Sequence, residues 1–184
     1  MSSAGDRVSS AGDRHSNADQ MLRTAREREA QLAAAGLSPR PGRRVAVLAC
    51  MDTRLDLFTM LGLEPGDAHI IRNAGGLATD DAIRSLSASQ RLLGTEEIVV
   101  LMHENCGLHG ASEDEFAAAL AADGILPTWR LGAFQDLDGT LRDSLSRLRA
   151  SPELPHRDHI RGLVFDPESG HLREVAGPGP GAGS

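Results

Sequence analysis

Short apolar runs alternate with longer stretches of helical spacing along residues 44–165. The runs are rich in β-branched and aliphatic side chains, and turn residues such as Pro41 and Gly42 separate them from what precedes. Runs of this kind are too short for helices and are typical of strands buried on both faces of a parallel sheet. We expect such strands at residues 45–50, 68–73, 97–102 and 160–165.

The stretches between the runs have apolar residues three or four positions apart and begin at capping residues. Thr79 precedes one helix and Gly94 ends it, and Ser112 opens a capping box before another helix over residues 116–122. Leucines at helical spacing predict a third helix over 137–150. A short helix is expected to begin at Asp52 and to end near Gly62.

This alternation predicts an α/β fold with a mostly parallel four-stranded sheet flanked by helices. A short additional C-terminal edge strand is expected over residues 172–175, after a turn at 166–170. The α/β domain then covers residues 43–176, and its length suffices for one sizeable core.

The ends of the chain differ from this central part. Residues 9–14 repeat the SSAGDR of residues 2–7, and segment 1–16 and the Gly/Pro-rich segment 177–184 are expected to be disordered tails. Residues 17–36 predict a helix capped by Ser16 or Asn17, with a thin apolar stripe. Because such a helix is marginal alone, we expect it to pack on a partner subunit.

Composition excludes several classes of partner. The formal net charge is −7, and no block of basic residues indicates nucleic acid or an anionic membrane. The apolar runs are too short to span a membrane, and the N-terminus has no signal-peptide pattern. With two cysteines in the chain, a reducing cytoplasm is the expected location.

Metal-capable side chains follow two of the predicted strands. Cys50 ends the first strand, and His103 and Cys106 follow the third. Because parallel strands end at the same edge of a sheet, these three side chains are expected to meet there. Two thiolates and one imidazole suit a zinc ion and leave a fourth position for water or a carboxylate. Asp52 is the nearest carboxylate and is expected to ligate the metal only in a closed state.

Three further positions belong to the same edge of the sheet. Arg54 can pair with Asp52 and hold its carboxylate. Gly75 and Gly76 follow the second strand, where paired glycines allow a positive φ or a close approach of the backbone to a substrate. His109 is a weaker candidate for the same pocket, and the remaining histidines have no comparable setting.

Taken together, these positions resemble the β-class carbonic anhydrase family. The resemblance rests on Cys50-Met51-Asp52-Thr53-Arg54, on the segment 72–76, which reads Arg-Asn-Ala-Gly-Gly, and on His103-x-x-Cys106. It is closest to the branch with methionine after the first cysteine and extends from about residue 17 to Val175. Serines stand at positions 51 and 53 in the commoner pattern, and the commoner pocket aromatics are missing here. These departures affect the pocket more than the metal site.

The resemblance implies a zinc-dependent lyase that hydrates carbon dioxide reversibly to bicarbonate and a proton. It implies Cys50, His103 and Cys106 as zinc ligands, with Asp52 and Arg54 as a catalytic dyad and Gly75 and Gly76 beside the substrate. A homodimer or dimer of dimers with a swapped N-terminal helix is also implied. Three alternatives stay open: hydrolysis of carbonyl sulfide or carbon disulfide on the same fold, a non-catalytic zinc-stabilised binding module, and a thiol redox protein.

Overall fold

The computed structural model describes residues 16–33 and 36–177. Its chain divides into a short N-terminal unit that reaches Leu37 and a main unit that begins at Ser38, and each is described by itself. The tails that we expect to be disordered lie outside the described residues, apart from Ser16 and Gly177 at their inner ends.

The N-terminal unit holds two consecutive helices rather than the single helix predicted for residues 17–36. Helix α1 (Asn17–Glu27) begins at Ser16, whose hydroxyl accepts a hydrogen bond from the N–H of Ala18. Arg28 leaves helical geometry, α2 (Glu29–Leu32) follows it, and the backbone is extended at Ala33. The segment 26–29 between the two helices is fully charged and exposed, and the apolar residues Met21, Leu22 and Leu32 are exposed as well.

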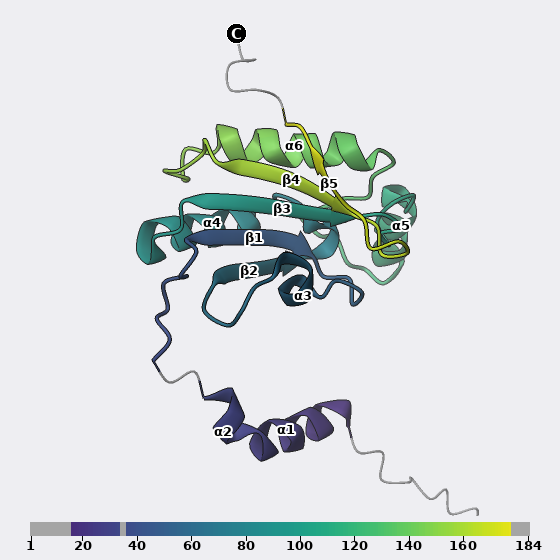
Figure 1. The fold of residues 1–184 in the computed structure, drawn as a ribbon. Coiled ribbons are helices and arrows are strands. Elements are labelled where there is room, and N and C mark those ends of the chain that lie inside the picture. The colour runs from purple at the N-terminus through teal and green to yellow at the C-terminus, as the bar shows by residue number, and fades with distance from the viewer. Residues whose placement is uncertain (1–15, 34–35, 178–184) are drawn as a thin grey trace, which may run out of the picture. The chain divides into compact units, whose positions relative to one another are not determined.

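The main unit is built on a sheet with strand order β2-β1-β3-β4-β5 among the described residues (Figure 1). Its strands are β1 (Val45–Cys50), β2 (Ala68–Asn73), β3 (Glu97–His103), β4 (Ile160–Phe165) and β5 (Leu172–Val175). The first four run parallel, and β5 pairs with β4 antiparallel. The predicted fold class, including the C-terminal edge strand, is confirmed.

Helices cover this sheet and bring their capping residues to the predicted places. They are α3 (Leu57–Leu61), α4 (Asp80–Leu93), α5 (Glu113–Ala122) and α6 (Leu137–Ala150), with a 3₁₀ turn, η1 (Ala74–Gly76), after β2. Thr79 and Ser112 accept N–H groups of the first turns of α4 and α5, and Gly94 ends α4 in the left-handed conformation. The bounds of α4 and α6 match the sequence pattern, whereas α5 begins at Glu113, three residues before the predicted start and directly after its cap Ser112.

Helix α3 is the exception, because it begins at Leu57 and not at Asp52. The Asp52 carboxylate accepts the N–H of Arg54, two residues on, and also binds the Arg54 guanidinium. Because the Asp52 carboxylate is already bonded within this local turn, Asp56 caps the helix instead by accepting the N–H of Thr59. The predicted end at Gly62 is confirmed.

The core lies between the sheet and the helices α4 and α6. Helix α4 packs against β1 and β2, and α6 against β3, β4 and β5. A Cβ on Gly162 of β4 would lie 2.8 Å from a methyl group of Leu145, so glycine lets α6 approach the sheet closely. Among the described residues, none of the helices is long and apolar enough to cross a membrane.

Candidate metal centre

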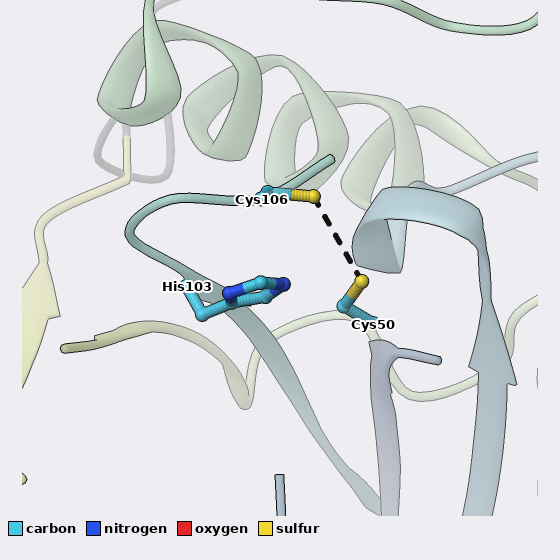
Figure 2. Close-up of side chains that lie close together, drawn as sticks. All are labelled: Cys50, His103 and Cys106. Carbon is cyan, nitrogen blue, oxygen red and sulfur yellow. Dashed lines mark hydrogen bonds between the residues drawn. The ribbon is translucent and has the colours of Figure 1, made fainter. Parts of the chain in front are cut away.

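The carboxyl ends of β1 and β3 bring the three predicted ligands together. The two strands are parallel neighbours, with Ala49 level with Leu101, so Cys50 and His103 leave the sheet at the same edge. Cys106 returns to that edge in the turn after β3. The ligand atoms of Cys50, His103 and Cys106 all lie within 4.8 Å of one another, and the two sulfurs are 3.9 Å apart (Figure 2).

Burial and hydrogen bonding orient the histidine of this cluster. The His103 side chain is fully buried, and its Nδ1 lies 2.9 Å from the carbonyl oxygen of Glu104, to which it donates a hydrogen bond. That bond leaves Nε2 with a lone pair, and Nε2 is a buried atom without a hydrogen-bond partner. An orphaned buried acceptor is costly unless something binds it. The ring is therefore set up as a ligand with its second nitrogen anchored.

The geometry of the sulfurs fits a metal ion of the size of zinc. Two thiolates at zinc–sulfur distances of about 2.3 Å in a tetrahedron stand about 3.8 Å apart, and here the sulfurs of Cys50 and Cys106 are separated by 3.9 Å. Both cysteines are free and buried. The donor set of two sulfurs and one imidazole nitrogen thus could hold such an ion with one position left open.

The pKa values of the two thiols shift in opposite directions. Burial raises the pKa of the Cys50 thiol, but the His103 ring and nearby backbone N–H groups outweigh burial and lower that pKa from 9.0 to about 7. Burial and then the negative charge on Cys50 raise the pKa of the Cys106 thiol. A divalent ion would place positive charge between the two sulfurs, and both cysteines would then bind it as thiolates.

Asp52 and Arg54 form a bidentate ion pair beside this cluster. Arg54 Nε donates to Asp52 Oδ1 at 2.9 Å, and Arg54 Nη2 donates to Oδ2 at 2.8 Å. Oδ2 also lies 3.7 Å from Nε2 of His103. The guanidinium holds the pKa of the Asp52 carboxyl far below its ordinary range. Asp52 is therefore an anion at neutral pH and can only accept hydrogen bonds.

Gly75 and Gly76 are buried behind the cluster, and both have a positive φ. A Cβ on Gly76 would lie 2.9 Å from the backbone N of Cys50 and from the carbonyl oxygen of Leu101, so this glycine lets η1 pack onto β1 and β3. A Cβ on Gly75 would instead meet the side chains of Leu108 and Leu77. Gly75 therefore faces an apolar surface, and Gly76 has a packing role.

Sequence reasoning missed Arg72 and Asn73 as supports of the site. Arg72 donates from Nε to the carbonyl of Cys50 and from Nη2 to that of Asp52, and so clamps the turn between them. The amide of Asn73 bonds both the N–H and the carbonyl of Leu77, which closes the turn around η1. Both residues lie in the Arg-Asn-Ala-Gly-Gly segment, which was the available signal.

His109 is not part of the cluster. Its Nε2 donates to the carbonyl oxygen of Gln135, and its ring stacks on Phe134 at 5.7 Å between centroids. The side chain thus serves the loop that follows the site.

Comparison with known proteins gives this cluster its context. The carbonic anhydrase family model matches residues 45–137. The chain is 46% identical over 136 residues to "Beta-carbonic anhydrase 1" of Mycobacterium tuberculosis, which covers 73% of this chain and 83% of that protein. The chain belongs to the β-carbonic anhydrase family.

The solved structure of a carbonic anhydrase from Streptococcus mutans has the same fold as this β-carbonic anhydrase family member. The two superpose with a TM-score of 0.81 at 38% identity, over 88% of this chain and 99% of that one. A "Carbon disulfide hydrolase" of Acidithiobacillus thiooxidans is 40% identical over 152 residues, covering 71% of this chain and 76% of that protein. The chain is therefore an enzyme of the carbonic anhydrase family, with relatives that are named for two different reactions.

Proposed function

We propose that this protein hydrates carbon dioxide to bicarbonate and a proton, with a zinc ion held by Cys50, His103 and Cys106. The observation that carries the proposal is the buried cluster of two sulfurs and an unpartnered imidazole Nε2, with the Asp52–Arg54 pair directly beside it. A zinc ion bound there would supply Lewis-acid activation of water near neutral pH.

Asp52 and Arg54 would act on the nucleophile. Because Asp52 stays ionised, it accepts a hydrogen bond from the O–H of the attacking hydroxide and cannot donate one. That bond directs a lone pair of the oxygen toward the substrate carbon. The two bonds from Arg54 hold the carboxylate in this arrangement. In a closed state Asp52 would instead be a fourth ligand of the zinc ion.

The surroundings favour a small, linear and apolar substrate. Gly75 lies next to the side chains of Leu77 and Leu108, and a Cβ on it would be 3.1 Å from a methyl group of Leu108. Carbon dioxide needs no hydrogen-bond donors for ground-state binding and fits such a surface. Addition of hydroxide to its carbon gives bicarbonate directly.

Carbon disulfide is the second candidate substrate, with carbonyl sulfide as its close analogue. It too is linear and apolar, and the Acidithiobacillus thiooxidans relative named for its hydrolysis is 40% identical to this chain.

We further propose that the protein forms a homodimer or a dimer of dimers. We also propose that it works in a reducing compartment such as the cytoplasm, because both thiols must stay reduced to bind zinc. The exposed apolar side chains of α1 and α2, among them Met21 and Leu32, support packing of this unit on the partner subunit.

The test measures both reactions on zinc-loaded protein. Stopped-flow hydration of carbon dioxide, followed with a pH indicator, is compared with sulfide release from carbon disulfide. We expect fast hydration, and in Asp52→Asn a loss of about 100-fold or more with zinc content unchanged. Sulfide release without hydration would establish the second candidate instead. Turnover of neither substrate by fully loaded protein would contradict both and favour a non-catalytic module.

A further inference from the structure

The guanidinium of Arg54 has a second partner besides Asp52. Its Nη2 donates to the carbonyl oxygen of Asn105 at 2.9 Å, while it also donates to Asp52 Oδ2. Arg54 is 43% exposed, and the Asp52–Arg54 pair is formed by two residues of one short turn. The bond to Asn105 ties this guanidinium to the segment that follows β3, outside the turn that it shares with Asp52.

Asn105 presents that carbonyl in an unusual conformation. Its φ is +53°, and it is one of the few non-glycine residues with a positive φ in the described part of the chain. Asparagine is among the residue types that best tolerate this region. Its side-chain Nδ2 donates to Oε1 of Glu168 at 3.1 Å. The side chain of Asn105 thus reaches the turn between β4 and β5, while its carbonyl points at Arg54.

The turn that carries Glu168 is itself well braced. Asp166 accepts the N–H of Glu168 on its side chain at 2.9 Å and the N–H of Gly170 on its carbonyl at 2.8 Å. The N–H of Asp166 donates to the carbonyl of His171 at 2.9 Å. Glu168 therefore extends from a fixed turn and offers Asn105 a fixed hydrogen-bond acceptor.

We propose that Asn105 and Glu168 are positioning residues that fix the Arg54 guanidinium, and through it the Asp52 carboxylate, beside the metal cluster. The path runs from Glu168 to the Asn105 side chain, from the Asn105 carbonyl to Arg54, and from Arg54 to Asp52. The consequence for catalysis rests on the proposed function, whereas the consequence for the orientation of Arg54 does not.

The test separates these two consequences. The Arg54 Nε–H resonance is recorded by ¹H–¹⁵N NMR on metal-free and zinc-loaded protein and assigned by its loss in Arg54→Lys. The variants are Glu168→Ala, Glu168→Gln and Asn105→Gly, since glycine keeps the positive φ and removes the side chain. Glu174→Ala, which removes another exposed carboxylate of the same hairpin, is the control.

We expect Glu168→Ala and Asn105→Gly to shift or broaden the Arg54 signal in both metal states, and Glu168→Gln and Glu174→Ala to leave it in place. In carbon dioxide hydration the first two should lower kcat about threefold to tenfold, the factor that one ordinary hydrogen bond represents, with KM unchanged. Glu168→Ala should have no further effect in an Asn105→Gly background, because both changes remove the same hydrogen bond.

An unmoved Arg54 signal in both Glu168→Ala and Asn105→Gly would overturn the proposal. Equal shifts in Glu168→Gln and Glu168→Ala would also overturn it, because the hydrogen bond that Gln can keep would then not matter. Additive effects in the double variant would overturn it as well, because the two residues would then act by separate routes. Protein that hydrates no carbon dioxide but shows the expected NMR shifts would contradict the proposed function and leave the positioning role supported.

Discussion

The sulfurs of Cys50 and Cys106 lie 3.9 Å apart although 56 positions separate the two residues in the chain. This contact predicts that both cysteines are needed for metal binding. In Cys106→Ser, zinc affinity should fall more than about 100-fold, since even outer-shell changes cost 10–100-fold. Competition with a chromophoric chelator measures it. His109→Ala, three residues beyond, should bind zinc as the parent does, and loss of zinc in that variant would contradict the ligand assignment.

Gly76→Ala should destabilise the fold by about 2–4 kcal/mol, because the new methyl group would press on two backbone atoms and the φ is positive. Those atoms are the N of Cys50 and the carbonyl oxygen of Leu101, each 2.9 Å from the added Cβ. Gly94→Ala is the matched control: its φ is +75°, but nothing lies within 4 Å, so about 1–2 kcal/mol is expected. Urea unfolding of metal-free protein measures both. Equal losses would show that the backbone conformation, and not the close packing, decides.

Glu113→Ala should release the loop around Gly132. The Glu113 carboxylate accepts the N–H groups of Leu131, Gly132 and Ala133 at 2.7, 3.0 and 3.2 Å. Because the three amides would lose a charged acceptor, hydrogen exchange at them should quicken more than about tenfold. Glu115→Ala in the same helix serves as the comparison. Unchanged exchange at Gly132 would rule out this anchoring role.

Acid should weaken the fold partly through Asp138. The Arg173 guanidinium, which donates two bonds to it, lowers the pKa of the Asp138 carboxyl. Because the pKa is lower in the folded state, the ion pair stabilises fully above the ordinary carboxyl pKa of about 4 and is lost as pH falls through the folded value.

Asp138→Asn should therefore lower the free energy of unfolding at pH 7 by less than about 1 kcal/mol, since the pair is partly exposed. Below pH 3 the difference in the free energy of unfolding between this variant and the parent should shrink. Urea unfolding at several pH values measures it. Asp114→Asn, on an exposed residue of α5, gives the baseline. A constant difference down to pH 2 would mean that the pair does not carry the pH dependence.

Much of the fold could be predicted because its signals are local. The bounds of β1, β2, β4 and β5 follow from apolar runs and turn residues, and Thr79 and Gly94 delimit α4 as expected. The meeting of Cys50 with His103 and Cys106 needed one inference beyond local pattern, that parallel strands end at a common edge, and the structure confirms it.

The start of α3 and the contacts that support the site could not be predicted, because they depend on competition between polar groups that the sequence pattern does not resolve. Asp52 is a good helix cap by type, yet a pairing with Arg54 takes its oxygens and Asp56 caps α3 instead. Arg72 donates a hydrogen bond to the backbone carbonyl of Cys50, and Asn105 offers its own backbone carbonyl to Arg54. Such contacts join distant turns, and no spacing in the sequence identifies them.

The parallel pairing of β1 with β3 also sets when the three donor side chains can first come together. Each strand contributes one donor at its last residue, so a slip of one position would turn Cys50 to the opposite side of the sheet from its correct site. A nascent chain thus lacks a complete chelate until Cys106 has been synthesised and the two strands have docked in their final alignment. The complete donor set therefore exists only in molecules in which β1 and β3 are paired in this register.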